Sequence, residues 1–132
     1  MDKEYDSIAQ ELVVKETHLS EILERSLSRL DIEIQELMRI DSRDMTEAHR
    51  QKIISSCQNT PEDKIVITHG TDTVDQTAQL LASQIQHKTI VFTGAMIPYK
   101  FDPACSIFNL SSALAFVQAL PQGIYIAMAG KC

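Results

Sequence analysis

Several residue types are scarce in this chain of 132 residues, and each scarcity excludes a class of protein. There is no tryptophan, aromatic residues make up 5%, and 18 acidic residues outnumber 12 basic ones, which gives a net charge of -6. Because Lys and Arg are also scattered, the chain lacks the electropositive surface that nucleic-acid binding requires. No apolar run approaches the roughly 20 residues of a membrane span, and M-D-K-E is not the start of a signal peptide. The sequence predicts no nucleic-acid partner and no membrane partner.

Cysteine is scarce as well. Cys57, Cys105 and Cys132 are an odd, widely spaced set, a pattern that is typical of reduced thiols in the cytoplasm and not of a disulfide framework. No pair of them has the spacing of zinc ligands, and the glycine-containing turns match neither the P-loop nor the dinucleotide fingerprint. The sequence therefore predicts a cytoplasmic protein with no metal and no cofactor.

The most informative stretch is K-I-V-I-T-H-G-T-D-T at residues 64–73. Its apolar, β-branched run, 65–67, is typical of a strand that is buried on both faces. Gly70 allows a sharp turn, and the small polar residues after it are of the kind that begin helices. A strand followed by a glycine turn, a polar cluster and a helix is how an open α/β sheet presents a ligand site.

The rest of the chain alternates between helical and strand patterns. We expect helices over residues 17–30, 44–57, 74–85 and 105–120, and strands over residues 31–40, 65–67, 89–92 and 124–128. Residues 1–16 are polar and weakly patterned, 31–40 alternates like a half-solvated edge strand, and Asp44 with Glu47 makes a capping signature. The last helix should point Phe108, Leu110, Ala113, Leu114 and Val117 inward. This alternation predicts one α/β domain over residues 1–132, a three-layer sandwich with a mostly parallel sheet.

Polar residues follow the predicted strands at Asp41-Ser42, at residues 69–72, at Thr93-Gly94 and at Ala129-Gly130. Because the carboxyl ends of parallel strands share one edge of a sheet, these groups should converge there. Hydroxyl and backbone N–H groups suit a carboxylate, and a carboxylate alongside them suits an amino group. Together they could hold a zwitterion.

Each of these residues also has a purely structural interpretation. Thr71 and Asp72 could cap the helix that follows, and Ser42 could be a turn or cap residue. His69 is more often a structural histidine that bonds to backbone than a catalytic base. From pattern alone, the sequence supports a soluble α/β domain with a polar edge site.

H-G-T-D-T at residues 69–73, after an apolar strand, resembles the bacterial-type L-asparaginases, and this signal is specific. D-S-R-D-M at residues 41–45 resembles that family's serine loop, T-G-A-M-I-P at residues 93–98 its G-A-M-x-P turn, and F-N-L at residues 108–110 its F-N-L helix. The resemblance extends from about residue 31 to residue 130. It corresponds to the amino-terminal domain of the full-length enzymes.

The resemblance implies roles for individual residues. Thr71 would be the second of two catalytic threonines, Asp72 would bind the amino group of the substrate, and Ser42 its α-carboxylate. Amide hydrolysis needs such groups, namely an activated hydroxyl, a fixed carboxylate anchor and donors that face the developing oxyanion.

The resemblance implies three further binding residues. Arg43 stands where many relatives carry Gln, Gly70 would shape the pocket, and backbone N–H groups around Ala95 would serve as oxyanion donors. The substrate would be asparagine, and the product aspartate with ammonia. Members of this family form dimers and tetramers, so a homodimer or higher homo-oligomer is expected.

Two parts of the family pattern are missing from these residues. The usual nucleophile of the family is a threonine in a T-G-G-T-I strand, and residues 1–5 resemble the residues that follow that strand. The family's catalytic lysine lies beyond Cys132. We therefore expect a missing first strand, an unpaired strand edge that invites self-association, and impaired catalysis. The alternatives are a non-catalytic module that binds aspartate or asparagine, and an interaction protein with a vestigial pocket.

Overall fold

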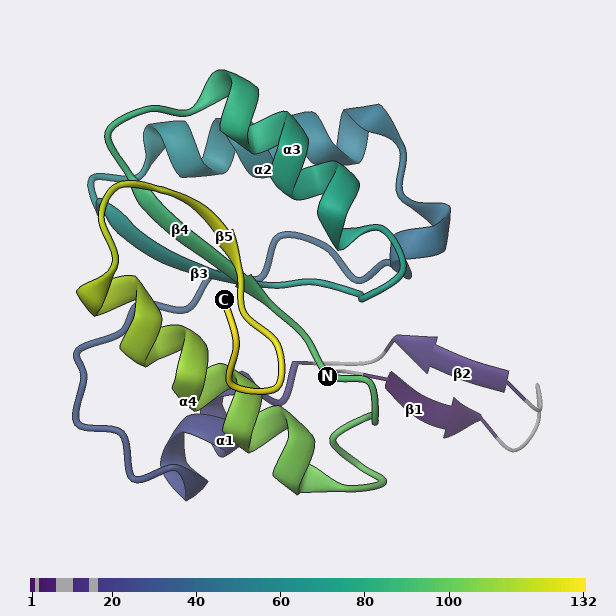
Figure 1. Ribbon diagram of the computed structural model, residues 1–132. Coiled ribbons are helices and arrows are strands. Elements are labelled where there is room, and N and C mark those ends of the chain that lie inside the picture. The colour runs from purple at the N-terminus through teal and green to yellow at the C-terminus, as the bar shows by residue number, and fades with distance from the viewer. Residues whose placement is uncertain (2, 7–10, 15–16) are drawn as a thin grey trace.

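The computed structural model of the chain describes residues 1, 3–6, 11–14 and 17–132. Its main sheet consists of β3 (Lys64–Thr68), β4 (Thr89–Thr93) and β5 (Gly123–Ile126), in the order β3-β4-β5 and with both pairs parallel. Helices α2 (Glu47–Asn59) and α3 (Val74–Gln84) cover one face, and α4 (Pro103–Ala119) with α1 (Leu19–Arg25) covers the other (Figure 1). The prediction of an α/β fold with parallel strands between two helical layers is confirmed.

β4 is the central strand of this sheet, and all five of its residues are buried. Its Ile90, Val91 and Phe92 are 0% exposed, which is expected of a β-branched and aromatic run that has a helix layer on each face. β3 was predicted to be equally buried, but its residues 65–68 are only half-buried. Among the described strands it has β4 as its one neighbour, so its other edge is open.

The predicted edge strand over residues 31–40 is wrong. This segment has no regular secondary structure, although its sequence alternates. A strand exists only where a neighbour completes its hydrogen bonds, and no backbone–backbone bond joins residues 31–38 to another described residue. The segment is held from α2 instead, where Lys52 Nζ donates to the Leu37 carbonyl at 2.9 Å and Ser56 Oγ to Gln35 Oε1 at 3.3 Å.

Three smaller expectations also need correction. The first predicted helix is shorter than residues 17–30, since α1 ends at Arg25 and Leu27 adopts a φ of 54°, outside the helical region. α2 begins at Glu47, with Thr46 donating its N–H to His49 Nδ1 at 3.0 Å, so Asp44 is not its cap. Asp44 lies in the preceding short helix η1 (Ser42–Asp44).

Phe108 is 56% exposed, although the rest of the predicted inner face of α4 packs inward.

Residues 3–6 and 11–14 form a separate two-stranded pair. β1 (Lys3–Asp6) pairs antiparallel with β2 (Glu11–Val14), and Figure 1 shows this pair standing apart from the three-stranded sheet. None of the helices in the described part of the chain combines the length and the apolar character that a membrane crossing requires.

Candidate functional site

The carboxyl ends of β3, β4 and β5 lead into the three segments that carry the polar residues, and η1 lies beside the first of them. Ser42 of η1 packs directly against the turn after β3. A Cβ atom added to Gly70 would lie 2.6 Å from Ser42 Oγ and 2.8 Å from Ser42 Cβ, so only glycine lets the two segments approach so closely. Ser42 is 1% exposed, and its Oγ has no hydrogen-bond partner among the described residues. A buried hydroxyl without a hydrogen-bond partner is rare in folded proteins.

Arg50 of α2 connects η1 to the loop after β3. Its guanidinium donates to Thr73 Oγ1 at 3.1 Å, to Thr77 Oγ1 at 3.0 Å and to the Met45 carbonyl at 3.2 Å. Thr73 Oγ1 in turn donates to the Ser42 carbonyl at 2.9 Å. Hydrogen bonds from a charged group are stronger than neutral ones. Arg50 therefore fixes the position of Ser42 relative to the turn at Gly70.

His69 extends the same network into the core. Its Nδ1 donates to the Gly70 carbonyl at 2.7 Å, because a carbonyl can only accept, and its Nε2 therefore accepts from Thr77 Oγ1 at 2.9 Å in the neutral ring. Burial lowers the pKa of His69, the Gly70 carbonyl raises it, and nearby Arg50 lowers it further. Both ring nitrogens are occupied, and the ring is buried against Phe92. His69 is thus placed as a structural residue.

Arg43 and Asp72 lie on the surface above this network. The Arg43 guanidinium binds both carboxylate oxygens of Asp41, at 3.1 and 2.9 Å, and its Nε lies 3.9 Å from Asp72 Oδ2. The hydrogen bond to Asp41 raises the pKa of Arg43, and the charge of Asp72 adds to this. The Arg43 and Asp72 side chains are 65% and 53% exposed, so both are accessible to a ligand.

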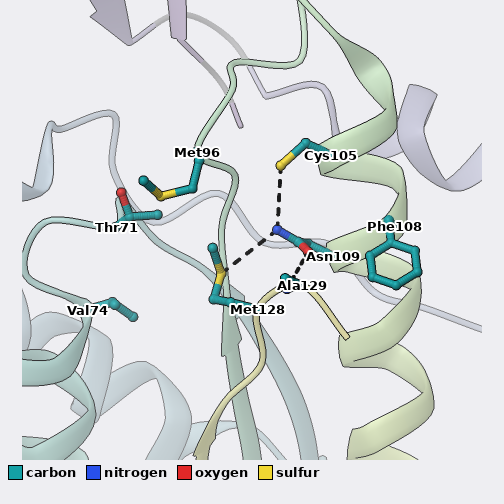
Figure 2. A pocket seen from close by; sticks show the side chains of 8 residues that line it. All are labelled: Thr71, Val74, Met96, Cys105, Phe108, Asn109, Met128 and Ala129. Atoms are coloured by element: carbon teal, nitrogen blue, oxygen red, sulfur yellow. Dashed lines mark hydrogen bonds between the residues drawn. The ribbon is translucent and has the colours of Figure 1, made fainter. Parts of the chain in front are cut away.

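Thr71 lies on the face of this loop that is turned away from η1. It lines a cavity of about 500 Å³ between the loop after β3 and α4. Figure 2 shows Thr71 and Val74 on one side of it and Phe108 and Asn109 on the other, with Met96 and Met128 between them. The remaining lining residues are Cys105 and Ala129. Apart from the thiol of Cys105, this lining contains no titratable side chain that could take a proton from the Thr71 hydroxyl.

Asn109 hydrogen-bonds to two of the segments that border this cavity. Its Nδ2 donates to the Gly94 carbonyl at 2.8 Å, and its Oδ1 accepts from the Ala129 N–H at 3.0 Å. It thereby joins the segments after β4 and β5. Thr71 lies close to Gly94, since a Cβ added to Gly94 would be 3.4 Å from Thr71 Cγ2. Ala95, the predicted oxyanion donor, follows Gly94 and is half-buried.

The structure thus brings the six predicted site residues to one edge of the sheet but divides them between two faces of one loop. Ser42 and Gly70 contact each other, and Arg43 approaches Asp72, whereas Thr71 and the turn before Ala95 lie towards α4. Sequence reasoning missed Arg50, Thr73 and Thr77 as the residues that hold the site. Thr73 ends the H-G-T-D-T motif, but no sequence signal marked its bond to Arg50 or singled out Arg50 and Thr77, because these bonds link positions 23 and 27 residues apart. No group of three potential metal ligands occurs among the described residues.

The fold and this edge define an α/β domain with a cluster of polar residues at the carboxyl ends of parallel strands. Residues 2–132 match the family model described as "Asparaginase, N-terminal". The chain therefore belongs to the asparaginase family and corresponds to its amino-terminal domain.

Individual relatives agree with this assignment. The chain is 41% identical over 71 residues to an L-asparaginase of Thermococcus kodakarensis, covering 52% of this chain and 22% of the relative. It is 36% identical over 85 residues to L-asparaginase 2 of Escherichia coli, covering 61% and 24%. These curated relatives are about four times as long as the segment they share with this chain.

Solved structures show the same likeness. The thermostable L-asparaginase from Thermococcus kodakarensis superimposes with a TM-score of 0.79 at 27% identity, over 96% of this chain and 40% of that one. A structure described as a probable cytoplasmic L-asparaginase from Campylobacter jejuni gives a TM-score of 0.73 at 29% identity, over 84% and 37%.

Proposed function

We propose that this chain is an asparaginase-type amidohydrolase domain whose edge site binds L-asparagine and L-aspartate, and that residues 1–132 by themselves turn over asparagine poorly. Membership of the asparaginase family supports the class of substrate and reaction. The observation that best supports amino-acid binding is the set of complementary polar groups on one face of the loop after β3. The Ser42 hydroxyl would hold the α-carboxylate, Asp72 the amino group, and Arg43 would lie beside both.

The poor turnover follows from the surroundings of Thr71. A threonine hydroxyl attacks an amide only when a nearby base takes its proton. The described residues that line its cavity are apolar or neutral apart from the Cys105 thiol. The nearest histidine in sequence, His69, has both ring nitrogens engaged. We propose that Thr71 and Asp72 belong to the catalytic site, with Gly70 shaping it and N–H groups near Ala95 as oxyanion donors, but that Thr71 is not activated in this arrangement.

Binding of L-aspartate tests this function. The ligand should raise the melting temperature in a saturable way, since a ligand that binds only the folded state stabilises it by mass action. Asp72→Asn and Ser42→Ala should each weaken the response, while Asp75→Asn, the same change on an exposed carboxylate of α3, should not. A response that is absent from the parent chain, or unchanged in Asp72→Asn, would contradict the proposed site.

The second candidate is a module that binds aspartate and never cleaves asparagine in any assembly. The absence of a base from the described residues that line the Thr71 cavity favours it. An ammonia-release assay on the protein as isolated from its source distinguishes the two functions. Ammonia formed from L-asparagine supports the amidohydrolase, whereas ligand stabilisation without ammonia supports the module.

We also propose that the protein works in the cytoplasm and as a homo-oligomer. Its three free cysteines agree with a reducing compartment. The large apolar side chains of Met96 and Phe108, which line the Thr71 cavity, are exposed, as are those of Ile97 and Phe101. Exposed apolar groups often mark subunit contacts. Analytical ultracentrifugation should show a dimer or larger species that Phe101→Asp weakens. A monomer at all concentrations would contradict the oligomer.

A further inference from the structure

Asn109 is a buried polar residue inside α4 whose side chain bonds outside its own helix. Asparagine is unfavourable within a helix, because its side chain competes for nearby backbone groups. The amide of Asn109 instead donates to the Gly94 carbonyl at 2.8 Å and accepts from the Ala129 N–H at 3.0 Å. Figure 2 shows this amide directed from α4 towards Met128 and Ala129. Both of its polar atoms thus serve the segments that follow β4 and β5.

Gly94 lies between two peptide units that have separate anchors. The Thr93 carbonyl, in the first unit, accepts from the His69 N–H at 2.9 Å. The Gly94 carbonyl, in the second unit, accepts from Asn109 and from no other residue in the described part of the chain. Because glycine has no Cβ, its φ and ψ have a wide range, and an anchor on the first unit does not fix the second. The orientation of the second unit therefore depends on Asn109.

This orientation determines the direction of the Ala95 N–H. The Gly94–Ala95 peptide bond is trans, and the C=O and N–H of a planar trans unit point in opposite directions. Asn109 holds the carbonyl towards α4, so the Ala95 N–H points away from Asn109. Ala95 is half-buried, and its N–H donates to none of the described residues. A donor in this situation is available to an acceptor on a ligand.

The residues after Ala95 provide no alternative anchor. Met96 and Ile97 are 72% and 44% exposed, and neither makes a backbone hydrogen bond to a residue that the structure describes. The loop is held again at Tyr99, whose hydroxyl donates to Glu21 Oε1 at 2.9 Å. The anchors therefore lie at the two ends of the loop, and Asn109 is the anchor next to Ala95.

We propose that Asn109 is a positioning residue, which fixes the Gly94–Ala95 peptide so that the Ala95 N–H is held as a donor for the side-chain oxygen of the bound amino acid. This inference rests on the function proposed above. In amide cleavage that oxygen carries the developing negative charge, and a donor whose direction is already set needs no reorganisation. The bond from Ala129 keeps the Asn109 amide from turning over, since the reversed amide would place its NH₂ group against an N–H donor.

Two amino acids isolate the bond to Ala95. L-Aspartate and L-α-aminobutyrate share their α-amino and α-carboxylate groups, but only aspartate has side-chain oxygens. Isothermal titration calorimetry on the 132-residue chain should give a Kd for L-aspartate that is at least about tenfold lower, which is the effect of a hydrogen bond to a charged group. In Asn109→Leu this preference should fall below about threefold, while the Kd for L-α-aminobutyrate should change by less than about twofold.

A second neutral variant guards against misfolding. Asn109→Ser has a side chain too short to reach both partners, and it should lose the preference for L-aspartate in the same way. Gln118→Leu is the matched control, because Gln118 is an exposed amide on α4 that donates to the Leu114 carbonyl of its own helix at 2.7 Å. The control should keep the preference of the parent chain.

Residual dipolar couplings measured by NMR report the direction of the Ala95 N–H itself. In ligand-free Asn109→Leu and Asn109→Ser, the Ala95 coupling should no longer fit the orientation found in the parent chain. The couplings of residues 90–92 in β4 should still fit it, and in Gln118→Leu the Ala95 coupling should fit as well. A purely structural role of Asn109 would not change the Ala95 coupling alone.

The possible failures are distinguishable. A parent chain that binds neither amino acid would contradict the proposed function, and the donor role of Ala95 with it. A parent chain that binds both equally well would overturn the donor role alone. If both amino acids bind and the folded Asn109 variants keep the preference for L-aspartate, lose affinity for both ligands equally, or keep the Ala95 coupling, then Asn109 does not position this N–H.

Discussion

The loop after β3 has two faces that differ in chemistry. The face towards η1 is polar and almost fully hydrogen-bonded, with Arg50, Thr73 and Thr77 holding it in place. The face towards α4 carries Thr71 into a cavity lined by sulfur-containing and apolar side chains. In the function proposed above, the first face holds an amino acid, and the second has no described residue that would activate the Thr71 hydroxyl. The comparison therefore makes a testable proposal, that binding and bond cleavage are separable properties of this site.

Gly70→Ala should cause the largest loss of stability and ligand affinity at the polar face. The added methyl group would meet Ser42 Oγ at 2.6 Å, and overpacking of this kind costs about 3 kcal/mol. Both the stability in urea and the affinity for L-aspartate should fall. The double variant Gly70→Ala/Ser42→Gly removes the colliding atoms, so it should recover most of the stability but not the affinity. Failure of this rescue would show that the close contact is not what requires glycine.

Removing Arg50 should have the next largest effect. Arg50→Met keeps much of the side-chain length but loses the bonds to Thr73, Thr77 and the Met45 carbonyl, at an expected cost of about 2 kcal/mol. Lys52→Met is the matched control on the same helix, where one exposed bond to the Leu37 carbonyl is lost, and it should cost less than about 1 kcal/mol. Equal midpoints of urea unfolding for the two variants would contradict the role of Arg50.

His69 should make the stability of the polar face depend on pH. Its pKa is lowered in the folded state, mainly by burial, so between that value and the unfolded pKa of about 6.5 the unfolded chain binds more protons. Stability should therefore fall as the pH drops below about 6.5, with a slope of at most about 1.4 kcal/mol per unit from this group.

The control for this prediction is a glutamine variant of His69, compared with the parent chain. His69→Gln should be less stable at neutral pH but should show a flatter profile between pH 5 and 7 than the parent chain. The measurement is the urea midpoint at each pH. An unchanged slope in His69→Gln would assign the pH dependence to other groups.

Arg43→Gln should have the smallest effect. The Arg43 guanidinium is exposed and already bound to Asp41, so its contribution to ligand affinity is weakened by solvent, and Kd for L-aspartate should change by less than about threefold. Raising the salt concentration should reduce the difference between parent and variant further. A much larger change in Kd would place Arg43 in direct contact with the ligand carboxylate.

Much of the fold was predictable from local patterns, and the two failures among the strands have one physical cause. The strand at residues 89–92 and the helices at 74–85 and 105–120 carry strong apolar periodicity, and their own residues decide their structure. Residues 31–40 alternate just as clearly, but a strand needs a partner edge, and no described strand provides one. The half-burial of β3 has the same origin, because burial depends on neighbours that its own sequence does not specify.

The common edge at which the predicted site residues lie was predictable, but their arrangement there was not. The motif at residues 69–73 placed the polar residues at the correct edge, since strand ends converge in any parallel sheet. It gave no sign that Ser42 and Thr71 lie on opposite faces of one loop, or that Arg50 joins η1 to α3. Such contacts are set by packing between distant segments, and a pattern within one segment does not encode them.

The central claim, that this chain has an assembled binding face and an unactivated hydroxyl, is tested most directly by one sample measured in two ways. Ammonia release from L-asparagine and the thermal shift with L-aspartate would be recorded on the same 132-residue protein. We expect a saturable rise in melting temperature and no ammonia above the uncatalysed background. Turnover at about 1 s⁻¹ or more, within the usual range of enzymes, would contradict the claim. It would mean that residues 1–132 already contain the base that Thr71 is argued to lack.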